Sequence, residues 1–412
     1  MAQPSSVRAT FQTLRHLPAA PGLSASVFAL GLGSSFAVPY LPLFGVQVAH
    51  MTPLRLGIFL TCVSLCSIIL STLLGRWSDK LPSRRPVVLL GLGSAVCAYL
   101  MLSVTRQYWL LLVLGGVLLG TGASSFPQLF AYARVQFASA AGDTIQHGLT
   151  SLRSIFSLAW VVGPLIGAAL LGAFSFGGLF VFSALAYGLA ALPVLLDTPR
   201  RRRKRPRPPP PQTPHSEPHG NPVTARQLQL IALAFALYST ALSMGASALP
   251  LFVTQTLHGS SGQVGWLIGL CALIEIPMML SFVLRPTRLS PASMMVAAFG
   301  LLAAYLLMVA FSGNIFWLSL SQVPRAGAIA ISACLGMAYF QDLMPGRVGA
   351  ATTLFANTSN AGNVLAGTLF GVWAQAFGYH SVFGLCVALS ALACALMLYV
   401  RHGRPGQALL KS

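Results

Sequence analysis

The chain has 412 residues, of which 55% are hydrophobic and only 8% are charged, and its mean hydropathy is +0.75. A soluble globular protein carries about 25% charged residues, so this composition excludes that class and indicates a protein with many membrane spans. A net charge of +19 would suggest nucleic acid as the partner of a soluble chain. The positive-inside rule explains it here, because Lys and Arg gather in alternate loops.

The first residues of the chain are polar and basic, and the apolar run after them is long enough to span a membrane. This pattern predicts that the chain has no cleavable signal peptide. All seven cysteines lie in apolar runs, and no spacing among them suggests a metal site. We therefore expect small packing residues at Cys62, Cys66, Cys97, Cys271, Cys334, Cys386 and Cys394.

A membrane span needs about 20 mostly apolar residues. On that measure the sequence predicts an all-α polytopic membrane protein with twelve transmembrane helices. Six spans precede a long polar stretch and six follow it. The predicted spans are 22–44, 55–75, 87–104, 108–131, 148–172, 176–196, 227–252, 263–284, 293–311, 315–339, 352–376 and 380–400.

The polar stretch between the two sets of spans is Asp197–Arg226, the one long run that cannot be buried. Basic residues crowd positions 200–207, and the proline run Pro208–Pro211 forbids a helix. We interpret this stretch as a linker. The expected domains are an N-terminal six-helix bundle over 1–196, a Pro/Arg-rich cytoplasmic linker over 197–226 and a C-terminal six-helix bundle over 227–412.

The charges of the loops predict the orientation of the chain. Lys and Arg precede the first span, follow each even-numbered span up to the tenth and close the chain, whereas the opposite loops hold only Arg55 and Arg106. Because Lys and Arg favour cytoplasmic loops, we expect both termini and the linker in the cytoplasm.

The two sets of spans repeat each other. Leu41–Phe44 at the end of the first span recurs as Leu249–Phe252 at the end of the seventh, and His50 matches His258 at the same offset. Since each set holds six spans and begins on the same side, the repeats are parallel. Further matches pair Gln47 with Gln255, Gly57 with Gly265, Gln128 with Gln341, Arg134 with Arg347, and Gly163 and Gly167 with Gly367 and Gly371.

Several strings carry a family resemblance. The loop Gly75–Arg85 resembles a signature of the major facilitator superfamily. The strings SFPQLFAYAR (125–134), SLAWVVGP (157–164), LIEIPMML (273–280) and FQDLMPGRVGAATTLF (340–355) resemble the bacterial sugar efflux transporter (Set) family. The resemblance implies the major facilitator fold and proton antiport with alternating access. The implied activity is secondary active efflux of sugars, glucosides or similar small polar molecules across the bacterial inner membrane.

Glu275 is the most unusual residue of the predicted spans, because it lies about midway along the eighth. A charged side chain there costs about 3 kcal/mol on insertion scales. Such a carboxyl suits proton-coupled export, and a structural carboxyl held by a neighbouring helix is the other interpretation. At a rise of about 1.5 Å per residue, Arg325 in the tenth span differs in depth by ~3 Å. We therefore predict an ion pair or a shared cavity for the two side chains.

Six residues are candidates for substrate binding. Three asparagines share one face of the eleventh span, where their amides can bind a polyol or join helices. Arg153 either meets an anionic or hydroxylated substrate or extends to the membrane surface. Trp160 and Trp266 either stack on a sugar ring or pack between helices. The candidates are Arg153, Trp160, Trp266, Asn357, Asn360 and Asn363.

A set of polar residues at the cytoplasmic ends of the spans is expected to form a gate. Asp79 would act as a latch, facing the positive N-terminal end of the eleventh helix when the inner gate is shut. Gln128 and Gln341 lie at matching ends of the fourth and tenth spans. The predicted gate comprises Asp79, Arg84, Arg85, Gln128, Arg134, Gln341, Asp342 and Arg347.

Other classes of protein fit the sequence less well. A multidrug or toxic-compound efflux proton antiporter of the same superfamily is the main alternative. A membrane-embedded enzyme needs catalytic groups clustered at one depth, whereas only Glu275 of the six acidic residues lies deep. A receptor or scaffold would not need a deep carboxyl near an arginine. We expect a monomer with no catalytic residue, cofactor, metal or nucleic acid, whose partners are a sugar-like small molecule, protons and the lipid bilayer.

Overall fold

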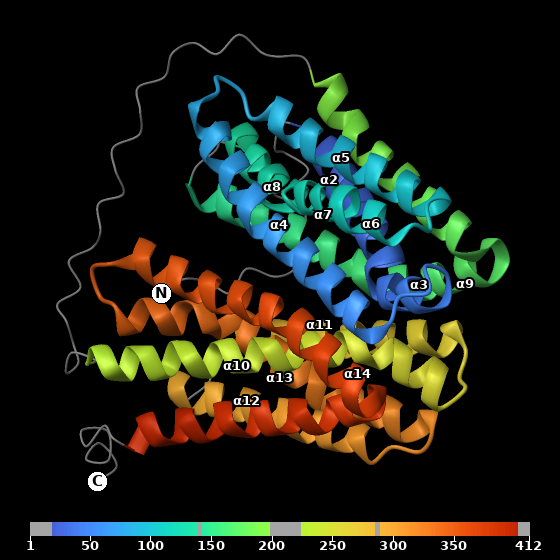
Figure 1. Cartoon of the computed structure of the whole chain (residues 1–412). Helices are drawn as coiled ribbons and strands as arrows, with labels where there is room; N and C mark the ends of the chain where they lie inside the picture. Colours follow the sequence, from blue (N-terminus) through green and yellow to red (C-terminus); the bar gives the residue numbers. More distant parts are fainter. Residues whose placement is uncertain (1–18, 138–141, 198–223, 285–288, 403–412) are drawn as a thin grey trace.

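The structure is a computed structural model that describes residues 19–137, 142–197, 224–284 and 289–402 (Figure 1). Its regular structure in these ranges is entirely helical. The predicted linker, 197–226, lies mostly outside them.

The first half holds α2 (Ala20–Ala37), the 3₁₀ turn η1 (Val38–Tyr40), α3 (Leu41–Gln47), α4 (Pro53–Lys80), α5 (Arg85–Val104), α6 (Tyr108–Leu110), the π turn η2 (Leu111–Gly115), α7 (Gly116–Ala123), α8 (Ser125–Gln136) and α9 (Gly142–Leu196). The second holds α10 (Ala225–Leu251), the π turn η4 (Phe252–Thr256), α11 (Ser261–Leu284), α12 (Pro291–Ala310), α13 (Ile315–Leu343) and α14 (Val348–His402).

The starts of several helices follow from local sequence. Thr52 precedes α4, and its hydroxyl accepts a hydrogen bond from the backbone N–H of Arg55 at 3.3 Å. Thr224 and Gln227 form a reciprocal capping box at the start of α10. Asn314 caps α13 as Thr52 caps α4, by a single hydrogen bond that its side chain accepts from the Trp317 N–H. Each cap satisfies a backbone donor that has no partner inside the helix.

Two helices are far too long to cross a membrane once. Both α9 and α14 run for 55 residues, which would measure about 80 Å against a hydrocarbon core of about 30 Å. Each is broken by one residue with non-helical dihedral angles, Ser175 (φ 58°) in α9 and Gly378 (φ 80°) in α14. The chain reverses at both points, which lie between the spans predicted from sequence.

The described residues contain ten helices that are long and apolar enough to cross a membrane. The two longest of these are the ones divided at Ser175 and Gly378. Counting their arms separately therefore fits the twelve spans predicted from sequence. The all-helical membrane fold predicted from sequence is confirmed.

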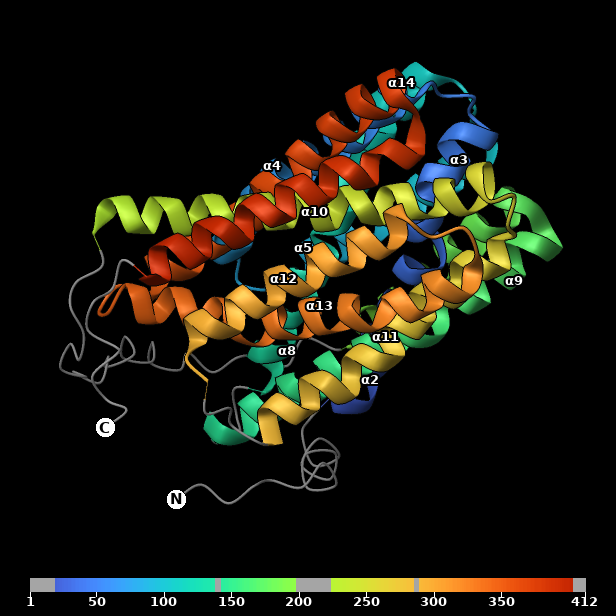
Figure 2. The ribbon, with the colours of Figure 1, turned by 90° about the horizontal axis from the view of Figure 1, so that it is seen from below.

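The helices pack as two bundles, one from each half of the chain (Figures 1 and 2). Within the first, α2 and α5 pack on α9, and α4 packs on α7. Within the second, α10 and α12 pack on α14, and α11 and α12 pack on α13. The two bundles meet mainly along two helix pairs, α4 with α14 and α9 with α11.

The backbone repeats between the two bundles in detail. His50 and His258, paired in the sequence, both adopt positive φ angles, 48° and 52°. In the first half the Met51 N–H donates to the Gly45 carbonyl at 2.8 Å, and in the second the Gly259 N–H donates to the Val253 carbonyl at 2.8 Å. Non-glycine residues rarely adopt positive φ, so the shared turn supports the sequence repeat.

The bundles are closest where Ser175 and Gly378 lie, which we call the kink end. A Cβ added to Gly57 of α4 would lie 2.4 Å from the Gly371 Cα of α14, and one added to Gly265 of α11 would lie 2.6 Å from the Pro164 carbonyl oxygen of α9. Only glycine permits such an approach of two helices. The opposite end, where Leu196 and Ala225 lie, is called the linker end, and Figure 1 shows the two sets of helices spreading apart toward it.

Hydrogen bonds between the bundles also occur toward the kink end. The Thr61 and Thr368 hydroxyl oxygens lie 3.2 Å apart, and the Leu54 N–H donates to Gln375 Oε1 at 3.4 Å. Both pairs join α4 to α14. The chain is thus held shut at the kink end by glycine packing and by polar contacts that accompany it.

Gly57→Ala should weaken closure of the kink end. The added methyl would overlap the α14 backbone, and overpacking of this kind costs about 1–3 kcal/mol. The measurement is the rate of disulfide formation between Thr61→Cys and Thr368→Cys in a cysteine-free background. We expect Gly57→Ala to lower that rate by about fivefold or more.

Gly93→Ala is the matched control, because nothing lies within 4 Å of a Cβ added to that exposed glycine of α5. It should leave the cross-linking rate unchanged. Equal rates in Gly57→Ala and Gly93→Ala would show that the glycine contact does not hold the kink end closed.

Candidate functional site

A cavity of about 520 Å³ lies between the two bundles. Both halves line it, with α2, η1, α3, α4, α5, α7, α8 and α9 on one side and α10, α11, α13 and α14 on the other. Most of the lining is apolar, and aromatic rings are contributed by Tyr99, Phe126, Phe156, Trp160 and Tyr187. Its volume falls within the range of about 300–1,000 Å³ that is typical of small-molecule sites.

The polar groups of the cavity are mostly hydroxyls and one amide. Ser34 and Ser64 donate to carbonyl groups of their own helices, so their oxygen lone pairs remain as acceptors. Ser243 of α10 donates to Asn363 Oδ1 of α14 at 2.5 Å, and both side chains line the cavity. This leaves the Asn363 amide N–H₂ as a donor beside hydroxyl acceptors.

Arg325 brings a positive charge into the cavity wall. Its side chain is 8% exposed, and one terminal nitrogen donates to Gln322 Oε1 at 3.1 Å. Its guanidinium carbon lies 5.4 Å from the centre of the Tyr305 ring, within the usual range of a cation–π contact. The buried Nε of Arg325 has no hydrogen-bond partner.

Glu275 lies on the neighbouring helix α11 and is half-buried. It is close enough to Arg325 for the two charges to interact. Among the described residues, however, the one ion pair with an N–O distance within 4.0 Å joins Arg84 to Asp79. The sequence predicts an ion pair or a shared cavity for these two side chains. The direct ion pair between Glu275 and Arg325 is not formed, and Arg325 lines the central cavity whereas Glu275 does not.

The other substrate candidates are divided between the cavity and the surrounding surface. Trp160 and Asn363 line the cavity, whereas Arg153, Asn357 and Asn360 do not. Both Arg153 and Asn357 are exposed.

Trp266 does not line the cavity either. Its indole N–H donates to Ser319 of α13 at 3.2 Å, and 49% of its surface is exposed. One of the two candidate tryptophans and one of the three candidate asparagines therefore line the cavity.

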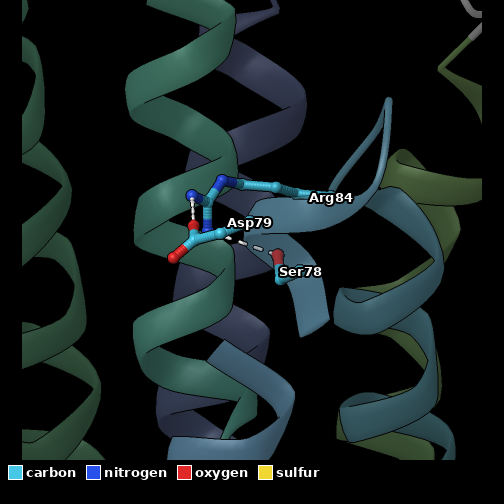
Figure 3. Close-up of polar contacts among 3 residues, drawn as sticks. All are labelled: Ser78, Asp79 and Arg84. Carbon is cyan, nitrogen blue, oxygen red and sulfur yellow. Dashed lines mark hydrogen bonds and ion pairs between the residues drawn. The ribbon is translucent and has the colours of Figure 1, made fainter. Parts of the chain in front are cut away.

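The residues of the predicted gate lie at the linker end of the bundles. Asp79 pairs with Arg84, which also donates to the buried Ser78 hydroxyl at 3.2 Å (Figure 3). These contacts fold the α4–α5 loop onto itself. Arg85 donates to the Leu195 carbonyl, which ties the start of α5 to the end of α9.

The remaining gate candidates are not assembled into one cluster. Gln128 is buried in α8, and Gln341 donates to the Thr352 hydroxyl at 3.0 Å across the α13–α14 turn. Arg134, Asp342 and Arg347 are exposed. In this arrangement Asp79 is paired with Arg84 of its own loop. The contact predicted from sequence, between Asp79 and the N-terminal end of the eleventh predicted span, applies to a different state, in which the linker end is shut.

Sequence reasoning missed three side chains that shape the site. Gln322 is the amide partner of Arg325, Tyr305 carries the ring beside it, and Ser243 holds Asn363. The first had a usable signal, because Gln322 and Arg325 are three residues apart in an apolar span and so share a helix face. Tyr305 lies on α12, and nothing in the sequence links it to α13.

Gln322→Leu should lower the stability of the folded protein. The substitution leaves Arg325 without its acceptor in a site where Gln322 is fully buried, and an unsatisfied buried partner costs about 1–3 kcal/mol. Thermal unfolding of the detergent-purified protein should begin several degrees lower. Gln255→Leu, at an exposed position, is the control, and equal melting of the two variants would contradict the role given to Gln322.

Two repeated helical bundles that enclose a mostly apolar cavity with a few buried polar groups have the architecture of a secondary transporter. A sequence model of the Major Facilitator Superfamily matches residues 23–236 and 231–411. The chain belongs to the Major Facilitator Superfamily.

Relatives that are named as sugar efflux transporters match over almost the whole chain. A Deinococcus radiodurans protein provisionally named a sugar efflux transporter is 46% identical over 93% of this chain and 98% of its own length. The sugar efflux transporter C of Escherichia coli is 30% identical over 91% of this chain and 94% of its own. A class H tetracycline resistance protein of Pasteurella multocida, at 28% identity, covers 48% of this chain and 47% of its own.

A solved structure has the same fold. The nucleoside transporter NupG superposes with a TM-score of 0.74 and 13% identity, covering 92% of this chain and 98% of that one. At such low identity the likeness concerns the fold alone.

Proposed function

We propose that this protein exports sugars, glucosides or similar small polar molecules across the bacterial inner membrane. The single observation that carries the proposal is the 46% identity to a sugar efflux relative over 93% of the chain and 98% of the relative. The hydroxyl and amide groups of the central cavity suit a polyol, and its aromatic rings suit a sugar face or an apolar aglycone. The proposal thus rests on similarity over the full fold and on a cavity of compatible chemistry.

Transport is proposed to proceed by alternating access between the two bundles. The glycine contacts and the Thr61–Thr368 pair close the kink end, and the two sets of helices diverge toward the linker end (Figure 1). The loop charges favour a cytoplasmic linker end and cytoplasmic termini. The arrangement described here then corresponds to the state that is closed toward the periplasm.

The driving force is proposed to be proton antiport through Glu275. An acidic side chain inside a membrane span is unfavourable when charged, so it is a functional candidate by default. Arg325 interacts with it electrostatically and lines the cavity. A change in the charge of Glu275 would therefore change the electrostatic potential at Arg325, and so at the substrate site, without a direct ion pair.

The domain organisation and the monomeric state predicted from sequence are part of this proposal. The proposed organisation comprises one bundle over 1–196, a cytoplasmic linker over 197–226 and a second bundle over 227–412, acting as a monomer without a cofactor. The cytoplasmic gate is proposed to use Asp79 and Arg84 in a second role. The Asp79–Arg84 pair would open when Asp79 turns toward the positive N-terminal end of α14.

A multidrug or toxic-compound antiporter is the second candidate. The mostly apolar cavity lining and the similarity to a tetracycline resistance protein favour it. That similarity extends over 48% of the chain, against 93% for the sugar efflux relative. The sugar proposal is therefore the better supported one.

Transport by inverted membrane vesicles distinguishes the two candidates. Vesicles that contain the protein and carry a pH gradient should take up labelled sugars or glucosides in a saturable manner. Collapse of the gradient should abolish that uptake, and vesicles without the protein should show none. Uptake of cationic dyes with no uptake of sugars would overturn the sugar proposal in favour of the second candidate.

Glu275→Gln should separate coupling from transport. The variant cannot exchange a proton at this position, so uptake driven by a pH gradient should fall to the background level. Exchange of labelled for unlabelled sugar at equal pH should continue, because the cavity and both gates are unchanged. Gradient-driven uptake equal to that of the parent protein would exclude Glu275 as the coupling group.

Asp79→Asn should slow transport without weakening substrate binding. The substitution removes the charge that pairs with Arg84 and is proposed to meet the start of α14. The expected result is a lower maximal rate of sugar exchange, with an affinity of the purified protein for the same sugar that is unchanged. A parental rate would remove Asp79 from the gate, and a lost affinity would place it in the binding site instead.

A further inference from the structure

The charge of the central cavity has consequences for the substrate. Of the described residues that line it, Arg325 alone carries a charge, and its side chain is only 8% exposed. The other lining residues with polar side chains are serines, Asn363, tyrosines and Trp160. An empty cavity of this composition presents one fixed positive charge to whatever enters it.

That positive charge is incompletely compensated. Gln322 is a neutral acceptor, the Tyr305 ring offers a weak attraction, and the Arg325 Nε has no partner. Glu275 interacts with the guanidinium but does not form an ion pair within 4.0 Å. A buried ion without close compensation is unfavourable by several kcal/mol, so an anion that reaches Arg325 gains more there than it would at the protein surface.

We propose that the preferred substrate is a monoanionic sugar derivative, a glycoside whose carboxylate binds Arg325. The inference rests on the proposed function, and it narrows the class of exported sugar. Guanidinium and carboxylate groups form paired, charge-assisted hydrogen bonds that are stronger than neutral ones. The sugar hydroxyls then meet the Asn363 amide and the serine oxygens of the same cavity.

The remainder of the cavity fits the uncharged part of such a molecule. Trp160, Phe126 and Phe156 lie on the wall formed by the first bundle, whereas Arg325 and Asn363 lie on the wall formed by the second. A glycoside with an aromatic aglycone can therefore place its apolar end against one bundle and its acidic sugar against the other. A neutral glycoside fills the same space and leaves Arg325 uncompensated.

Two chromogenic glycosides of matched shape test the proposal. The probes are 4-nitrophenyl β-D-glucuronide and 4-nitrophenyl β-D-glucoside, which differ in a carboxylate in place of a hydroxymethyl group. Binding to the full-length purified protein is measured by calorimetry at one pH and one salt concentration. The charge-assisted contact should make the glucuronide bind about tenfold or more tightly than the glucoside.

Variants of Arg325 locate the origin of this preference. Arg325→Gln should bind the two glycosides equally, and Arg325→Lys should retain part of the preference for the glucuronide. Arg401→Gln removes one positive charge from the exposed end of α14 and should leave the preference unchanged. Loss of the preference in Arg401→Gln would mean that net charge, and not the cavity, selects the anion.

A second variant covers the case in which Arg325→Gln does not fold. Glu275→Gln removes the carboxylate that partly offsets Arg325, so the glucuronide should bind several-fold more tightly while glucoside binding stays the same. Parental binding of the glucuronide by a folded Glu275→Gln variant would count against a site where substrate and Glu275 share one cation.

The outcomes separate this inference from the proposed function. Equal binding of the two glycosides by the parent protein, or a preference for the glucoside, overturns the anionic substrate and leaves sugar export standing. Failure to bind either glycoside, together with no sugar uptake in the vesicle assay, overturns both.

Discussion

The architecture of this protein depends on the contact of glycine with backbone where the two bundles meet. Gly57 against Gly371, and Gly265 against Pro164, bring α4 to α14 and α11 to α9 at distances that no side chain would allow. Both contacts lie toward the kink end, so the bundles converge there and spread toward the linker end (Figure 1). The cavity between them exists because helices that touch at one end and diverge cannot also touch along their middles.

The second constraint is the low dielectric of that cavity. Inside an apolar wall, each polar interaction is stronger than it would be in water, and an unpaired charge is more unfavourable, because no solvent screens it. Arg325 and Glu275 lie on adjacent helices of the second bundle, and their charges interact without an ion pair within 4.0 Å. The guanidinium of Arg325 thus lines the cavity, and the carboxyl of Glu275 interacts with it electrostatically. In the proposed mechanism, the substrate and the carboxylate of Glu275 would compete for the guanidinium of Arg325, which would link the proposed site to the proposed driving force.

Much of the fold was predictable from sequence, and the site was predictable only in part. Hydropathy located the reversals near Ser175 and Gly378, and the repeated residues around His50 and His258 anticipated two turns of the same geometry. Among the candidate residues, Trp160 and Asn363 lie in the cavity wall, whereas Trp266 turns to Ser319 and Arg153 lies outside. Depth along a span follows from counting residues, but the direction that a side chain faces depends on how each helix is rotated.

The sequence by itself determined that the chain is a helical membrane protein of two repeated halves with a basic link between them. Those properties follow from local composition, because a bilayer demands long apolar helices and alternating loop charge. Tertiary structure alone decided which helices touch, which end is closed, and that Arg325 is held by Gln322 and Tyr305 instead of an ion pair with Glu275. These depend on the rotation and crossing of whole helices, since lipid-facing and partner-facing positions are equally apolar in the sequence.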